Sequence, residues 1–283
     1  MSTSARNSFF QWLILGLFVF IFLGGDAWAQ SRLYHAVASD NISRTKRFLT
    51  RKDNPNGDGN PQYIPMIAAA EANFYRQVVI LVQHGADVNI QNHIGFTPLM
   101  EATIQRNHRI MNYLMNNGAN LEIRANNGAT ALMVAVNASN TRGARMLLEK
   151  GANPNIIDNA GFTPLMKAME IGDNIELVRT LVEFRANMEA LDPNGNPVLM
   201  VYPYRNRIAA HRELINLGAD VNIRNREGQT PLIKAVLEGN LEMTRFLVEK
   251  GADRHMKDNS GASATDYAIT QFEIRQYFES LRN

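Results

Sequence analysis

Cysteine does not occur anywhere in this chain of 283 residues. Its absence excludes disulfide frameworks, thiolate zinc sites, iron–sulfur ligation, cysteine nucleophiles and lipid attachment through cysteine. An excess of charge of one sign is missing as well, because 29 Lys and Arg residues balance 27 Asp and Glu residues. A net charge of +2 is too small for a dedicated nucleic-acid binder, so we do not expect nucleic acid as the partner.

The signatures of catalysis and cofactor binding are also missing. The six histidines are scattered along the chain and form no cluster with metal-ligand spacing. Zinc-protease, phosphate-binding-loop, serine-hydrolase and dinucleotide-binding motifs do not occur. We therefore expect no enzyme, no cofactor and no metal site. With 45% apolar and 20% charged residues, the chain can nevertheless bury a large core, which excludes a disordered protein.

A long apolar run lies near the N-terminus. Arg6 precedes an uncharged stretch over 7–25, and the triplet Ala27-Trp28-Ala29 follows it. A basic start, an apolar stretch and a small-x-small triplet are typical of a secretory signal peptide, so we predict a signal peptide over 1–29 that is cleaved after Ala29. The alternative is an uncleaved signal anchor, because a helix of this length, at about 1.5 Å per residue, just spans a bilayer.

The rest of the chain repeats a motif with a period of about 33 residues. The clearest copies begin with glycine, at Gly95, Gly128, Gly161, Gly195, Gly228 and Gly261. Their spacing is even except for one added residue before Gly195. A second motif, in which alanine precedes Asp or Asn, keeps the same period from Ala86 to Ala252. Two motifs in phase over so many periods predict a protein built from stacked repeats.

Each position of the repeat has a physical role. Two residues after the glycine, a threonine such as Thr97 is a good helix N-cap, and proline follows at the first helical position. The leucine after it is the predicted buried anchor, and the alanine three residues later allows neighbouring helices to approach closely. Large residues should therefore not fit in this alanine column, at positions such as Ala135 and Ala168. Tyr202 stands in the same column in the least regular unit, where a binding role and neutral drift are alternative explanations.

Helix–turn–helix–loop units of this length with Thr-Pro-Leu and Gly-Ala-Asp signatures resemble ankyrin-repeat proteins. The resemblance extends from Ser31 to the C-terminus and implies an all-α ankyrin-repeat solenoid with hairpin loops, six full repeats and two truncated capping repeats. We expect the domain over 30–283, with repeats at about 30–58, 59–91, 92–124, 125–157, 158–191, 192–224, 225–257 and 258–283. Where the family has histidine after Pro-Leu, this chain has methionine or isoleucine, which predicts a more apolar seam.

The resemblance also implies that hairpin tips and first helices form a concave groove that binds another protein. Aromatic residues that follow the glycine column would anchor a partner, and basic residues in the C-terminal half would select an acidic segment. The predicted partner-binding residues are Tyr63, Phe96, Phe162, Tyr204, Arg205, Arg224, Arg226 and Lys257. Two alternatives remain: the aromatic residues pack on the next hairpin, and the basic residues form a solvated rim.

The sequence as a whole predicts an exported, non-enzymatic, monomeric protein that acts by binding another protein. We expect it in the periplasm or secreted, because a signal peptide precedes the repeats. The alternative is a membrane-tethered scaffold held by an uncleaved N-terminal segment, and contact with the membrane is expected only in that case.

Overall fold

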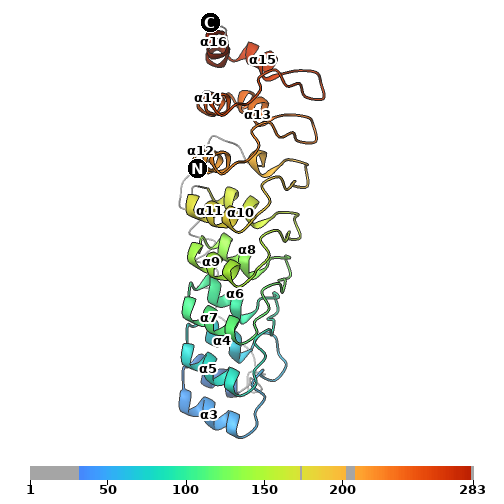
Figure 1. Cartoon of the computed structure of the whole chain (residues 1–283). Coiled ribbons are helices and arrows are strands. Elements are labelled where there is room, and N and C mark those ends of the chain that lie inside the picture. The colour runs from blue at the N-terminus through green and yellow to red at the C-terminus, as the bar shows by residue number, and fades with distance from the viewer. Residues whose placement is uncertain (1–31, 173, 202–207, 282–283) are drawn as a thin grey trace.

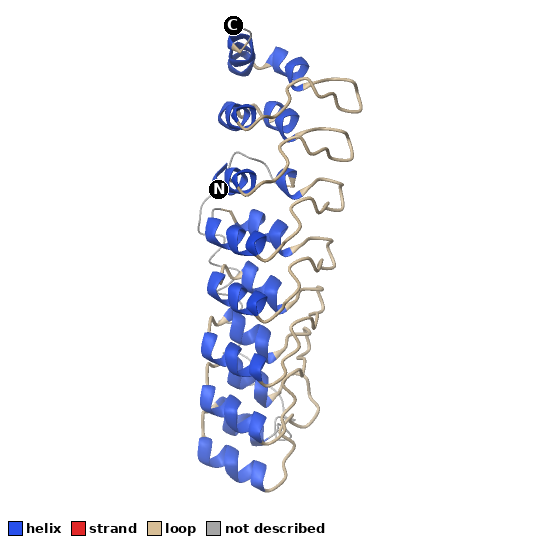
Figure 2. Cartoon of the chain, viewed as in Figure 1, coloured by secondary structure: helices blue, strands red, loops and turns tan. Residues whose placement is uncertain are grey.

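The computed structural model describes residues 32–172, 174–201 and 208–281, and all regular elements within them are helices (Figures 1 and 2). The helices follow one another in pairs, and a long loop leads from each pair to the next. Second helices stack along one side of the array, first helices stack beside them, and the loops project on the other side (Figure 1). The predicted all-α solenoid is therefore confirmed. Ser31, Tyr202, Tyr204 and Arg205 lie outside the described residues.

The helices recur at the spacing found in the sequence. The first helices are α2 (Arg32–Ala38), α4 (Pro65–Glu71), α6 (Pro98–Ile104), α8 (Ala131–Asn137), α10 (Pro164–Ile171), the single turn η2 (Val198–Met200), α13 (Pro231–Leu237) and α15 (Ala264–Tyr267) with η4 (Ala268–Thr270). The second helices are α3 (Ile42–Thr50), α5 (Tyr75–Gln83), α7 (His108–Asn116), α9 (Thr141–Glu149), α11 (Ile175–Glu183), α12 (Ile208–Asn216), α14 (Leu241–Glu249) and α16 (Phe272–Ser280).

Local hydrogen bonds explain where these helices begin. The hydroxyl of Thr97 accepts a hydrogen bond from the backbone N–H of Met100 at 3.3 Å, and Thr163 and Thr230 cap their helices in the same way. Each such cap contributes about 1 kcal/mol to stability. Asparagine caps second helices by accepting from the N–H three residues later, at Asn41, Asn107, Asn140, Asn174 and Asn240.

The core runs along the array in columns. Ala69, Ala102, Ala135, Ala168 and Ala235 are completely buried, because the small side chain lets successive first helices lie close together. The methionine column that replaces the family's histidine is buried too, at Met100, Met133, Met166 and Met200. The expected apolar seam is therefore present, and each repeat buries its apolar faces against its neighbours rather than in one central core.

A column of arginines joins the second helices of the C-terminal half. These arginines recur once in each repeat, and each reaches the following second helix, in the pairs Arg145–Glu183, Arg179–Glu213, Arg212–Glu242 and Arg245–Tyr277. Two nitrogens of Arg145 donate to the two oxygens of Glu183 at 3.1 and 3.0 Å, and this guanidinium lowers the pKa of Glu183. Such exposed pairs are individually weak, at about 0–1 kcal/mol each.

Candidate protein-binding surface

Recurring hydrogen bonds join the loops between helix pairs to one another, and we call three sets of them the tip ladder. In the first set, a side-chain oxygen accepts a hydrogen bond from a backbone N–H of the next loop. For example, the Asn120 N–H donates to the side-chain oxygen of Asn89 at 2.7 Å. The same bond joins Asp87 to Asn56, Asn153 to Glu122, Asn187 to Asn155 and Asp253 to Asn222. Side chains on the loops are therefore held at a repeating spacing.

The second and third sets connect the hairpin tips themselves. Backbone N–H groups donate to the preceding hairpin in the pairs Asn126–Ile94, Asn159–Asn127, Arg226–Gly195 and Asn259–Glu227, at 3.0 to 3.1 Å. In the third set, long side chains donate to a carbonyl of the next hairpin, from Gln91 to Arg124, from Arg124 to Ile157 and from Arg224 to Lys257.

The three predicted aromatic anchors are half-buried at the base of the hairpins. The ring of Tyr63 meets the ring of Tyr34 edge-on, with 5.3 Å between the ring centres. Phe96 and Phe162 pack against the core, and the ammonium group of Lys167 lies 4.6 Å from the Phe162 ring centre. These side chains therefore contribute to packing and keep part of their surface accessible.

The predicted basic residues behave differently from one another. Arg224 is exposed, yet its guanidinium donates to the carbonyls of Gly228 at 3.0 Å and Lys257 at 2.7 Å. The structure thus gives Arg224 a role in joining hairpins. Arg226 and Lys257 are exposed, and no ion pair involves either of them among the described residues.

Glu101 is a partly buried acidic residue in the first helix α6. It is not among the residues predicted from the sequence. Its carboxylate accepts a hydrogen bond from Asn92 at 3.4 Å. Desolvation by burial, with repulsion from Glu71 added, raises the pKa of Glu101 to about 7. The shift depends on neighbours from other repeats or loops, so no local sequence signal points to it.

Glu101→Gln should reduce the pH dependence of stability between pH 4.5 and 7.5. Because the folded state holds a proton on Glu101 that the unfolded chain has lost, stability is full near pH 4.5 and falls as the pH rises through 7. The shift corresponds to a loss of up to about 3 kcal/mol in the wild type. Urea unfolding at pH 4.5, 6 and 7.5 measures it, with the exposed Glu149→Gln as control. Equal slopes for the wild type and Glu101→Gln would contradict this assignment.

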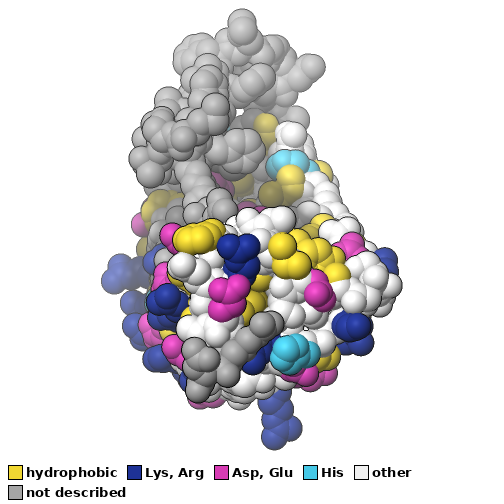
Figure 3. Space-filling model, turned by 90° about the horizontal axis from the view of Figure 1, so that it is seen from above, with side chains coloured by type: hydrophobic (Ala, Val, Ile, Leu, Met, Phe, Trp, Pro, Cys, Tyr) yellow, Lys and Arg dark blue, Asp and Glu magenta, His cyan; other side chains and the backbone are white. Residues whose placement is uncertain are grey.

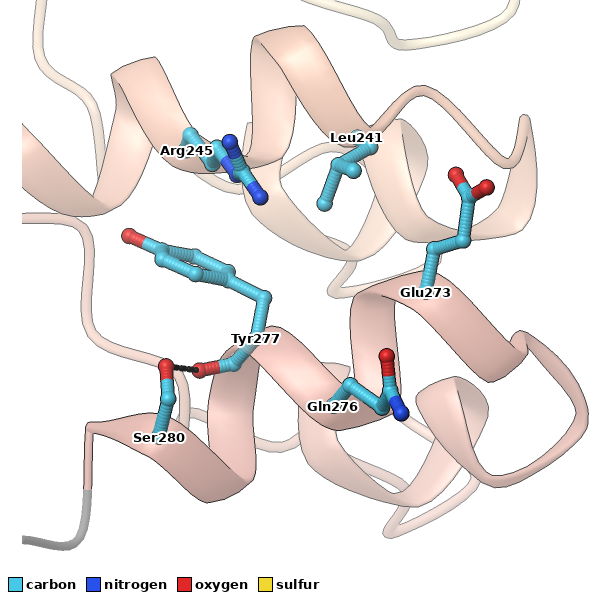
Figure 4. A pocket seen from close by; sticks show the side chains of 6 residues that line it. All are labelled: Leu241, Arg245, Glu273, Gln276, Tyr277 and Ser280. Atoms are coloured by element: carbon cyan, nitrogen blue, oxygen red, sulfur yellow. Dashed lines mark hydrogen bonds between the residues drawn. The ribbon is translucent and has the colours of Figure 1, made fainter.

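A shallow hollow of about 390 Å³ lies between α14 and α16, in the second-helix layer. Figure 4 shows Arg245 above the ring of Tyr277, with Glu273 and Gln276 at the other end. The hollow has no group of three metal-ligating side chains, and none was found elsewhere in the described part of the chain. Its lining is mostly polar, with Leu241 as the aliphatic side chain.

The C-terminal end face mixes side chains of every kind. Apolar, basic and acidic groups lie side by side when the array is seen from this end (Figure 3). In the last repeat, Ile269 and Phe272 are each 62% exposed. None of the helices in the described ranges is long and apolar enough to cross a membrane.

Helix pairs stacked in register, with loops joined along one side, define a helical repeat solenoid. Family models of ankyrin repeats match it in three places: the model of three copies at residues 65–158, the single repeat at 160–193, and the model of many copies at 214–268. Only the short stretch 194–213 separates the last two matches. The chain belongs to the ankyrin-repeat family.

Solved and curated relatives agree with this assignment. The crystal structure of the ankyrin repeat domain of Bcl-3, a member of the IkappaB protein family, superposes with a TM-score of 0.68 at 26% identity, over 78% of this chain and 98% of that one. Ankyrin repeat protein OPG189 of Variola virus is 30% identical over 120 residues, which are 39% of this chain and 21% of the viral protein. Protein phosphatase 1 regulatory subunit 27 of Mus musculus is 26% identical over 36% of this chain and 66% of that protein.

The family membership has a functional consequence at a coarse level. Ankyrin repeats imply interaction with protein partners, and the fold is typically a non-enzymatic scaffold. The repeated columns of accessible side chains described above suit that role, because each repeat adds side chains to one continuous surface.

Proposed function

We propose that this protein is an exported, monomeric, non-enzymatic ankyrin-repeat protein that captures a partner protein on the concave groove of its hairpin tips and first helices. The observation that carries the proposal is the tip ladder, which holds neighbouring hairpins in register within the N-terminal half, where the aromatic residues lie, and within the C-terminal half, where the basic residues lie. A preorganised surface loses little conformational entropy when a partner binds.

The two ends of this surface have different chemistry. Tyr63, Phe96 and Phe162 supply half-buried rings in the N-terminal half, and such rings are frequent hot-spot anchors. Arg226 and Lys257 supply exposed positive charge towards the C-terminal end, and the exposed Arg224 adds to it. We propose a partner with an apolar segment and an acidic segment, whose association is faster at low salt. Tyr204 and Arg205 belong to the proposed surface on sequence grounds alone.

Export rests on the N-terminal signal segment, residues 1–29. Mass spectrometry of the mature chain should find Gln30 at its N-terminus. Retention of Ser2 or Met1 in the membrane fraction would instead support the alternative, a scaffold tethered by residues 7–25.

Phe96→Ala and Arg226→Ala should each weaken binding of a captured partner by about 2 kcal/mol, roughly 30-fold, if these side chains lie at the centre of the interface. Partners are captured from the exporting compartment, purified, and titrated against the variants. Phe272→Ala and Arg142→Ala are the matched controls, because both side chains are exposed outside the proposed groove.

Circular dichroism must show that each variant is folded, and Phe96→Leu, which keeps an apolar side chain in place, separates packing from binding. Loss of binding in Arg142→Ala or Phe272→Ala, together with full binding by Phe96→Ala and Arg226→Ala, would show that the partner uses another face.

A further inference from the structure

Hairpin 187–197 lacks part of the tip ladder towards its N-terminal neighbour, although the first-set bond from Asn187 to Asn155 remains at 2.7 Å. Pro193 stands where Asn126 and Asn159 stand in earlier hairpins, and those two residues donate their backbone N–H to the preceding hairpin at 3.1 Å. Proline has no N–H, so this bond cannot form. Pro193 still packs against Gly161. Its Cγ lies 2.8 Å from the point where a Cβ would stand if residue 161 carried one. The hairpins therefore stay in register without the hydrogen bond.

The long donor side chains of the tip ladder are replaced on both sides of this hairpin. Arg124 and Arg224 each donate to the next hairpin at 2.7 Å. Ile157 and Leu191 occupy the equivalent positions between them, and neither side chain can donate a hydrogen bond. Both remain largely in solvent, at 50% and 56% exposed.

The link from hairpin 187–197 to its C-terminal neighbour is also reduced. Glu189 stands where asparagine or Glu122 joins successive loops elsewhere, and no bond from it to the next loop is found in the described part of the chain. The hydrogen bonds that join these two hairpins within that part run from Arg226 to Gly195 at 3.1 Å and from Asn225 to Asn196 at 3.0 Å.

The helices that follow this hairpin are also irregular. The first helix is the three-residue turn η2, whereas the first helices on either side of it, α10 and α13, have eight and seven residues. Lys234 of the next repeat donates to the carbonyl of Met200, at the end of this turn, at 2.7 Å. The second helix α12 packs extensively on α11, whereas its few contacts with α14 include the Arg212–Glu242 ion pair and the Arg212 guanidinium over the Phe246 ring. Within the described residues, the repeat that contains η2 and α12 is therefore the least regular part of the array.

We infer that the solenoid opens in two blocks. The N-terminal block contains α2 to α11, and the C-terminal block, residues 220–281, contains α13 to α16. Hairpin 187–197, η2 and α12 lie between them and form the joint. In a linear array, stability is a sum of repeat and nearest-neighbour interface terms. A weakened interface therefore allows one block to open at a free energy below that of global unfolding.

The C-terminal block opens first, because it has two helix pairs and the N-terminal block has five. Fewer pairs provide fewer stabilising interfaces. This property is independent of the partner and of the groove proposed above, so its test needs neither.

Hydrogen exchange of the full chain, read by mass spectrometry, tests the inference directly. Amides of α14 should exchange at least about ten-fold faster than those of α5. The two helices are a matched pair, since each lies one helix pair inside its end of the described array. The step in protection should fall between α11 and α13. Equal exchange of α5 and α14 would overturn the inference.

A repaired variant tests the cause. Pro193→Asn, Ile157→Arg, Leu191→Arg and Glu189→Asn install residues that occupy the same positions at intact junctions. The exchange rate of α14 should then fall to within about three-fold of that of α5. Pro193→Asn alone is the milder variant if the quadruple change does not fold, and it should slow exchange of α14 in the same direction.

The converse change moves the defect to an intact junction. Asn159→Pro with Arg124→Ile removes the second-set and third-set bonds between two N-terminal hairpins, together with the bond from the Asn159 side chain to the Asn126 carbonyl. Proline is compatible with this position, because Pro193 occupies it in hairpin 187–197. A new protection step should appear between α9 and α11. A folded repaired variant with an unchanged step, or a broken variant without a new one, shows that the tip ladder does not set the block boundary.

Discussion

Ala135→Tyr lowers the free energy of unfolding by about 3 kcal/mol or more, at the upper end of the cost of overpacking. Ala135 is completely buried in α8, and the equivalent Ala102 and Ala168 are completely buried in the first helices on either side. A ring at this position fits only if the helices move apart. Because the repeat lies inside the array, that movement weakens both of its interfaces.

The measurement is urea unfolding followed by circular dichroism. Asn137→Tyr is the matched control, since Asn137 is exposed in the same helix and its replacement leaves the stack intact. A similar loss of stability in the two variants would mean that the alanine column is not what sets the approach of the first helices.

Gly128→Ala is the second change with a large expected effect, a loss of about 3 kcal/mol. Gly128 has a φ of +81°, which costs an alanine about 1–2 kcal/mol. In addition, the new Cβ would lie 2.6 Å from the backbone nitrogen of Asn159. That contact pushes the next hairpin away and breaks the tip ladder between Asn159 and Asn127.

Gly151→Ala separates the two causes. Gly151 has a φ of +91°, but nothing lies within 4 Å of the place of its Cβ. It should therefore lose only the backbone contribution, about 1–2 kcal/mol. Thermal unfolding of both variants under one condition gives the difference, and an equal loss would argue against the close approach of the hairpins.

Much of the fold could be predicted because the residues that begin and end each helix act over a few neighbouring positions within one repeat. The threonine and proline at the start of a helix act over a few neighbouring positions, and the glycine turn is equally local. Their recurrence fixed the period, and the period placed the buried columns. The least regular unit was also visible in the sequence, since Pro197-Val198 stands in place of Thr-Pro.

The surface was harder to predict because its contacts join residues one repeat apart in space. Arg224 was predicted as partner-binding from its charge, but its guanidinium also joins two hairpins. The tip ladder, the environment of Glu101 and the links from Arg145 onwards depend on neighbouring units. For the arginine column a signal did exist, since arginine returns at the same place in consecutive repeats, at Arg145, Arg179, Arg212 and Arg245.

Those arginine links lie in one layer of the array, and this placement has a mechanical consequence. A stack that is tied along one side bends when the ties on that side strengthen or weaken. Three of the links are exposed ion pairs, and dissolved salt screens such pairs. Raising the salt concentration should therefore loosen the second-helix side of the C-terminal half, by a small amount because each pair contributes only about 0–1 kcal/mol.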